Sequence, residues 1–177
     1  IDMEHGGYST MYSRNTAGDG TAMAWRAGAV LANMEFLQAG IGVAHPFLNL
    51  FGNYLWKASP TLRNSLGEDI LKKYAGSDRA AARAVEEKTH FPFSCRDASG
   101  LIEIAVQSEI NAGRTTPHGN VTLDFRSTDF SPLLAHDPVF AGMWDTTYRW
   151  HRERGIDLYR DDVEVACIIY NRRDAYI

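Results

Sequence analysis

The sequence predicts an α+β fold, a helical domain with a few short strands. A long amphipathic helical repeat occupies the middle of the chain, around residues 98–113. Apolar and polar residues alternate over residues 121–125, which is typical of a half-buried strand. The chain has 177 residues, of which 45% are hydrophobic, and this is enough to form a core.

The helix predicted in the middle of the chain has its apolar residues, from Ala98 to Val106, at helical spacing. Polar residues, including Glu109, fall largely on the opposite face. Ser94 is the predicted N-cap, and Gly113 supplies the left-handed residue that ends the helix.

These boundaries place Arg96 in the first helical turn, where unpaired backbone N–H groups already form a positive end. Two interpretations are open. Arg96 pairs with Asp97 or another surface carboxylate, or it joins the backbone donors in binding an anion such as a carboxylate, phosphate or sulfate.

Further elements follow from caps and periodicity. Ser65 and Glu68 form a predicted capping box before a short helix that ends near residue 75. Ser77 begins an exposed helix, and Asp137 with Pro138 begins another that buries aromatic residues. The apolar run 163–170 is a predicted buried strand whose continuation lies outside the chain.

Composition excludes several classes of function. The net charge is −4 with mixed signs and no basic stripe, so nucleic acid is not an expected partner, and no stretch is long enough to span a membrane. Cys95 and Cys167 have no metal-ligand spacing, and no metal site is expected. Cys95 is either a small buried side chain or a redox-active thiol beside Arg96.

Gly18, Asp19 and Gly20 precede a run with small residues on one face, so a helix begins at Asp19 and can approach another element closely. This Gly-Asp-Gly turn has two interpretations: a plain capped turn, or a place where the backbone comes close to a ligand.

Three segments resemble one family. Residues 17–38, AGDGTAMAWRAGAVLANMEFLQ, are similar to the TGDG-x-AMA-x-RAGA-x-L-x-x-MEF-x-Q segment of the fumarate reductase/succinate dehydrogenase flavoproteins. Residues 94–110 resemble the PRD-x-x-x-x-AI helix of that family, and GNVTLDFR at 119–126 resembles its G-x-V-x-LDLR strand. The resemblance extends from about Gly6 to Arg126.

The resemblance implies that residues 1–36 are the C-terminal tail of an FAD-binding domain segment and that residues 37–177 form the capping domain, which binds the substrate. The full-length parent would be an FAD-dependent oxidoreductase that transfers a hydride between FAD and an anionic substrate. Arg96 would be the catalytic proton shuttle. Asp19, with Gly18 and Gly20, would contact FAD.

Without a G-x-G-x-x-G unit, this part alone is expected neither to hold FAD nor to be active. The resemblance also implies an iron–sulfur electron-transfer subunit as partner, and a cytoplasmic location peripheral to a membrane complex.

The chain departs from the family where the substrate binds. The place of the family's substrate histidine falls on Gly40, and His45 replaces it only if the loop at 39–44 is an insertion. His45 is a substrate contact or a structural histidine, and Arg63 is a substrate contact or a solvated loop arginine. Residues 50–74 look more like the adenylylsulfate reductase flavoproteins, so a reductase of that branch, or a non-catalytic anion-binding domain, is the alternative.

Overall fold

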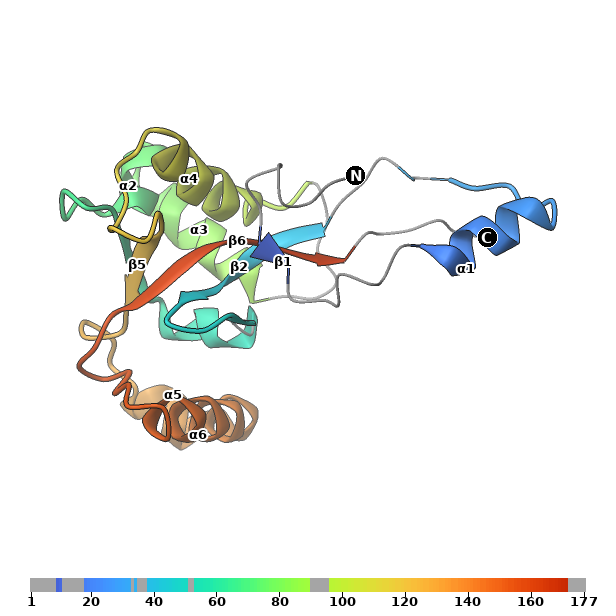
Figure 1. The fold of residues 1–177 in the computed structure, drawn as a ribbon. Helices are drawn as coiled ribbons and strands as arrows, with labels where there is room; N and C mark the ends of the chain where they lie inside the picture. Colours follow the sequence, from blue (N-terminus) through green and yellow to red (C-terminus); the bar gives the residue numbers. More distant parts are fainter. Residues whose placement is uncertain are drawn as a thin grey trace. The chain divides into compact units, whose positions relative to one another are not determined.

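The structure is a computed structural model that describes residues 9–10, 18–32, 34, 38–50, 53–89 and 96–171 (Figure 1). It combines helices with a small, mainly antiparallel sheet, so the predicted α+β class is confirmed. The helices are α1 (Asp19–Arg26), the 3₁₀ helix η1 (Asn53–Ala58), α2 (Ile70–Ala75), α3 (Asp78–Lys88), α4 (Gly100–Asn111), α5 (Ser131–His136) and α6 (Pro138–Arg152). The strands are β1 (Ser9–Thr10), β2 (Gln38–His45), β3 (Asn49–Leu50), β4 (Thr61–Arg63), β5 (Val121–Asp124) and β6 (Val163–Asn171).

The chain divides into two compact units. The first contains residues Ile1–Gly40 and Cys167–Ile177, and the second contains Ile41–Ala166. The predicted assignment of residues 1–36 and 37–177 to two domains rests on resemblance and stays a prediction.

In the first unit, β1 pairs in parallel with residues 168–169 of β6. Helix α1 begins at Asp19, as predicted, after Gly18 in a left-handed conformation with φ of 81°. It ends at Arg26, shortly before Gly28 with φ of 93°, and none of its residues is buried. The close packing expected for its small-residue face is therefore absent from the described residues.

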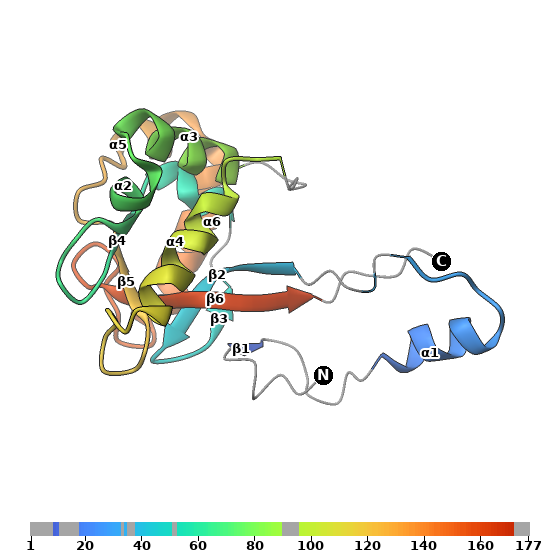
Figure 2. The same ribbon diagram turned by 90° about the horizontal axis from the view of Figure 1, so that it is seen from above.

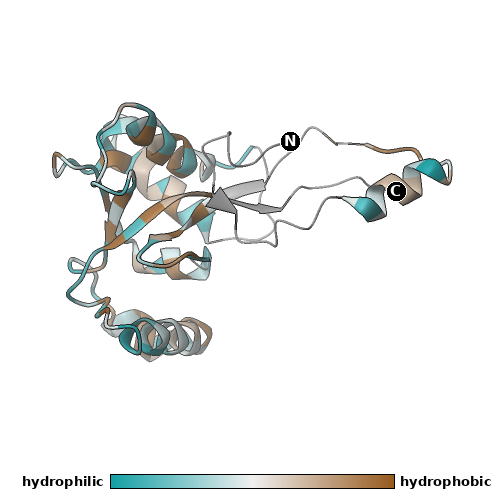
Figure 3. Ribbon diagram, viewed as in Figure 1, coloured by the Kyte–Doolittle hydropathy of each residue, from teal (hydrophilic) through white to brown (hydrophobic). Residues whose placement is uncertain are grey.

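The second unit is built on strands in the order β3, β2, β6, β5 and β4. The pairs β2–β3, β4–β5 and β5–β6 are antiparallel. The predicted strands at 121–125 and 163–170 are confirmed, and Val121, Leu123, Val163 and Val165 are buried. In Figure 3 the part of β6 in this unit carries brown, hydrophobic segments. Residues 39–44 belong to strand β2 and do not form the loop expected from the family comparison.

Helices α2, α3 and α4 pack on one another, and α2 and α4 contact β4 and β5 (Figures 1 and 2). Two predicted caps are confirmed. The Ser77 hydroxyl accepts a hydrogen bond from the backbone N–H of Ala80 at 3.2 Å, and the Asp137 carboxylate accepts one from Phe140 at 2.9 Å.

Helix α3 is less exposed than predicted, since it buries residues that include Ala84 and Val85. On α6, Phe140 and Trp144 are buried in an aromatic cluster with Phe125 and Phe130. Trp144 is thus core, as helical spacing indicates.

The predicted capping box of Ser65 and Glu68 is wrong. Asp69 caps α2, because its carboxylate accepts a hydrogen bond from the backbone N–H of Lys72 at 3.2 Å. The amide oxygen of Asn64 accepts from the backbone N–H groups of Leu66 and Glu68, both at 3.0 Å. Asn64 therefore closes the turn that the capping box was expected to form.

The central helix also starts later than predicted. Helix α4 begins at Gly100, with Ser99 at its N-cap position, so Arg96 lies in the turn before the helix and not in its first turn. The predicted N-cap Ser94 is outside the described residues. The end of the helix agrees with the prediction, because Gly113 follows it with φ of 69°. Among the described residues, no helix is long and apolar enough to cross a membrane.

Candidate functional site

The turn that carries Arg96 is attached to the helix before it. The backbone N–H of Ala98 donates to the carboxylate of Glu87, and Lys88 forms an ion pair with Glu103 of α4. Lys88 is only 4% exposed, so this pair joins the end of α3 to the start of α4 in a sheltered position. The Arg96 side chain is exposed, and the hydrogen bond to Glu87 holds the backbone of its turn at Ala98.

Arg63 lies on β4, and its guanidinium contacts Asp124 on the neighbouring strand. Nε of Arg63 is 3.4 Å from Oδ2 of Asp124, and Nη1 donates to the backbone oxygen of Gly67 at 3.2 Å. Burial alone would raise the pKa of Asp124, but hydrogen bonds from Arg126 and Arg63 lower it overall. Arg63 is thus part of a charged cluster on the sheet, and its role as a substrate contact stays a prediction.

His45, at the end of β2, stacks on His118, with ring centroids 3.6 Å apart and an interplanar angle of 12°. Nδ1 of His118 lies 2.8 Å from Oε1 of Glu164 on β6. Among the described residues, these three side chains form the one group of potential metal ligands, and their ligand atoms lie within 4.8 Å of one another. The expectation that no metal site exists considered only cysteine spacing.

The other oxygen of Glu164 is held by the loop before β5. Thr116 donates its hydroxyl to Oε2 of Glu164 at 2.7 Å, and the side-chain amide of Asn120 donates at 3.0 Å. Burial would raise the pKa of Glu164, yet the hydrogen bonds from Thr116, Asn120 and His118 lower it below the ordinary value. Glu164 is therefore ionised at neutral pH and fixed in one orientation.

Sequence reasoning missed His118 and Glu164. They are 46 residues apart, and they meet because the register of β5 and β6 places Glu164 opposite Thr122, next to the loop that carries His118. Within its own segment, neither His118 nor Glu164 belongs to a recognisable metal-binding motif. Only the order of the strands brings His45 to the same place.

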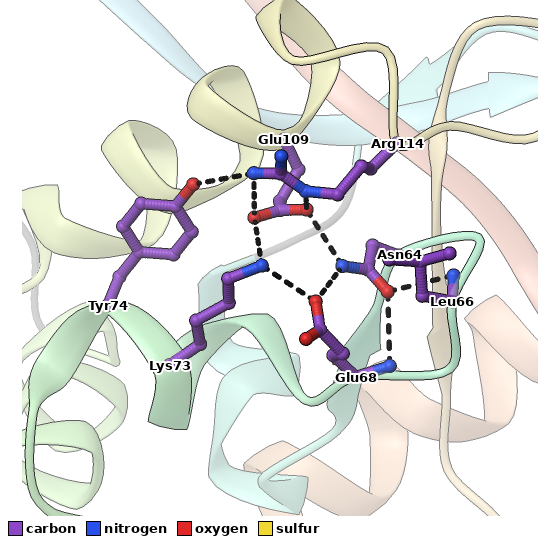
Figure 4. Close-up of polar contacts among 7 residues, drawn as sticks. All are labelled: Asn64, Leu66, Glu68, Lys73, Tyr74, Glu109 and Arg114. Carbon is purple, nitrogen blue, oxygen red and sulfur yellow. Dashed lines mark hydrogen bonds and ion pairs between the residues drawn. The ribbon is translucent and has the colours of Figure 1, made fainter.

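Another carboxylate of the second unit is surrounded by side-chain donors, two of them positively charged (Figure 4). Glu109 on α4 is fully buried, and Arg114 binds both of its oxygens, through Nε at 2.6 Å and Nη2 at 2.9 Å. Lys73 lies 3.2 Å from Oε1, and the side-chain amide of Asn64 donates to Oε2 at 2.8 Å. The prediction that Glu109 lies on the polar face of the helix is thus wrong.

The hydrogen bonds from Arg114, opposed by burial, lower the pKa of Glu109 far below the usual range. Glu68 extends the network, since its Oε2 accepts from Lys73 and from Asn64, both at 2.6 Å. The cluster joins α2, α4 and the turn after β4. Because every oxygen of Glu109 has a protein partner, we interpret it as a structural element.

The predicted FAD contacts Gly18, Asp19 and Gly20 are exposed at the start of α1, and within the described part of the chain no side chain caps that helix. The exposure of these three residues is compatible with a ligand contact. Cys95 is outside the described residues, and Cys167 is buried.

No protein-family model matches the chain, and no curated protein matches it. Solved structures do. Mycobacterium smegmatis Sdh1 in complex with UQ1 is 26% identical, with a TM-score of 0.56, over 92% of this chain and 24% of that chain. A quinol-fumarate reductase with menaquinol molecules is 22% identical, with a TM-score of 0.57, over 93% of this chain and 27% of the other.

A mutant FrdA chain of E. coli quinol fumarate reductase gives 20% identity and a TM-score of 0.60, over 93% of this chain and 27% of that one. The structural neighbours are thus succinate dehydrogenase and quinol-fumarate reductase flavoprotein chains, and this chain spans about a quarter of their length. The resemblance of residues 50–74 to adenylylsulfate reductase stays a prediction from the sequence.

Proposed function

We propose that the chain is the substrate-binding capping part of a flavoprotein oxidoreductase of the fumarate reductase/succinate dehydrogenase type. The observation that carries the proposal is the fold similarity to the Mycobacterium smegmatis chain, which extends over 92% of the residues at 26% identity. The order of the family-like segments around Asp19, Arg96 and Val121 supports it independently.

In this proposal, FAD bound by the full-length protein supplies the hydride chemistry, and the chain described here orients the substrate and moves the proton. Gly18, Asp19 and Gly20 would contribute backbone donors to the cofactor. Their exposure fits such a contact.

Arg96 would deliver the proton to the substrate anion or remove it. A guanidinium is a weak acid in water, so the role requires a site that closes over the side chain, with a carboxylate nearby to share the proton. Asp97 is the adjacent carboxylate in the sequence. The hydrogen bond between the Arg96 turn and Glu87 would keep the guanidinium in position next to the substrate.

The substrate would be a small anion. His45 and Arg63 are the candidates for binding it, and each would have to exchange a present contact, the His118 ring for His45 and Asp124 for Arg63. An iron–sulfur subunit would accept or supply the electrons, and the enzyme would lie at the cytoplasmic face of a membrane complex.

Substitution of Arg96 in the full-length enzyme tests the proposal. In Arg96→Lys and Arg96→Gln we expect loss of fumarate reduction driven by a reduced viologen dye, with the flavin content unchanged, because the proton donor is lost and the cofactor site is not. Arg79→Lys, on the exposed start of α3, is the matched control and should retain activity. Turnover in Arg96→Gln close to that of the parent would remove the assignment.

A further inference from the structure

Three potential metal ligands of the second unit come from three different elements. His45 ends β2, Glu164 lies on β6, and His118 lies in the loop that leads into β5. Strands β2, β6 and β5 are consecutive in the sheet, so backbone pairing places His45 and Glu164, and the loop that carries His118 leads directly into β5. Side chains on paired strands keep their spacing well, as a preformed site requires.

The loop that carries His118 is closed by its own hydrogen bonds. The backbone N–H of Thr116 donates to the carbonyl of Asn120 at 2.8 Å, and that of Gly119 donates to the carbonyl of Thr116 at 2.9 Å. Gly119 has φ of 83°, a conformation that other residues rarely adopt. Two side chains of the same loop, Thr116 and Asn120, hold Oε2 of Glu164.

Metal-binding carboxylates usually have one oxygen fixed by hydrogen-bond donors and the other oxygen directed at the metal ion. Glu164 is oriented in the same way. Its Oε1 meets Nδ1 of His118 at 2.8 Å. A divalent ion can take the place of the proton between these two atoms when the remaining proton of His118 is on Nε2.

After a modest movement of the side chains, the distances between the ligand atoms would suit a small transition-metal ion. In a tetrahedral zinc site with bonds of about 2.05 Å, two ligand atoms are about 3.3 Å apart. The ligand atoms of His45, His118 and Glu164 lie within 4.8 Å of one another. The two stacked rings must open from parallel so that both nitrogens point at one ion, and His118 has room for this because its side chain is 50% exposed.

We propose that His45, His118 and Glu164 bind one zinc ion and leave its fourth position open. Two imidazoles with one carboxylate are a donor set that zinc accepts, and magnesium and calcium, which prefer oxygen ligands, are disfavoured. The exposure of His118 admits water or a small anion to the fourth position. The site rests on these three residues alone. A His45 that binds zinc would not bind the substrate anion, so the zinc site is an alternative to that role of His45 and leaves the rest of the proposed flavin chemistry unchanged.

Isothermal titration of zinc chloride into the full chain tests the site, with affinity tags removed and metal stripped by chelation. We expect one zinc per chain. In His118→Gln and Glu164→Gln the affinity should fall by on the order of 100-fold or more, because even groups that only support metal ligands have effects of that size. His136→Gln, on the exposed end of α5, is the control and should bind zinc like the parent.

Cobalt substitution distinguishes this site from a cysteine site. Bound by His45, His118 and Glu164, cobalt should show visible ligand-field bands of a four- or five-coordinate ion without a thiolate charge-transfer band in the near ultraviolet. Circular dichroism shows whether each variant is folded. The proposal is overturned by unchanged zinc affinity in folded His118→Gln, by a thiolate band, or by absence of binding in the parent.

Discussion

Two carboxylates of the second unit, Glu109 and Glu164, have opposite surroundings. Glu109 is inaccessible to solvent, and donors from Arg114, Lys73 and Asn64 occupy both of its oxygens (Figure 4). Glu164 has a 17% exposed side chain and shares one oxygen with a histidine that is half exposed.

This difference distinguishes a carboxylate with a structural role from a carboxylate that can bind a ligand. A charge whose partners are all supplied by the protein and whose access to water is closed can do little except hold elements together, here α2 and α4. A carboxylate with one fixed oxygen and the other oxygen beside a half-exposed histidine remains able to bind another ligand. A large pKa shift alone therefore does not mark the functional site, since the stronger shift belongs to Glu109.

The largest expected effect follows removal of the Glu109 charge. Glu109→Gln leaves Arg114 and Lys73 without their buried counter-ion, so the free energy of unfolding should fall by about 3 kcal/mol. Urea denaturation of the chain measures it. Glu153→Gln makes the same chemical change at a side chain that is 73% exposed, and its effect should stay within about 0.5 kcal/mol. Equal effects at the two positions would contradict the structural role of Glu109.

The free energy of unfolding of the chain should also depend on pH because of the Glu109 carboxylate. Its folded pKa lies below the ordinary value of 4.5, so the stabilisation is fully present above that pH and is lost as the pH falls below it. The urea midpoint of the parent should therefore drop between pH 6 and pH 3.5, and Glu109→Gln should show a smaller drop. Parallel curves for the two proteins would mean that the native carboxylate is not specially stabilised.

A smaller effect on stability is expected at Glu164. Glu164→Gln keeps an acceptor for Thr116 and Asn120 but weakens the charge-assisted hydrogen bonds, so about 1 kcal/mol should be lost without zinc. Thermal unfolding with chelator present measures it. A loss of stability as large as that of Glu109→Gln would mean that Glu164 is also a structural charge and does not differ from Glu109 in role.

Local signals in the sequence predicted much of the fold. Ser77 and Asp137 cap their helices because a cap needs only the two or three residues that follow it. The same reasoning failed at Ser65, where Asn64 takes the backbone donors of the turn while also binding Glu109, 45 residues away. Competition from a distant partner is not visible in a short window.

The candidate site shows the same limit. The family resemblance makes His45 a candidate, but its neighbour His118 is far along the chain and has no spacing that links the two. Glu109 has helical spacing that places it on the polar face, and it is nevertheless buried because Arg114 and Asn64 supply its partners. Strand order and long-range ion pairs decide these positions, and periodicity does not encode them.

We propose that this chain forms the substrate side of a flavoprotein oxidoreductase, and the visible absorbance spectrum of the full-length protein tests this proposal most directly. We expect a bound-flavin spectrum that bleaches when a chemical reductant is added and returns when fumarate follows, with no return in Arg96→Gln. A full-length protein that purifies without flavin, and takes none up when FAD is added, would contradict the account.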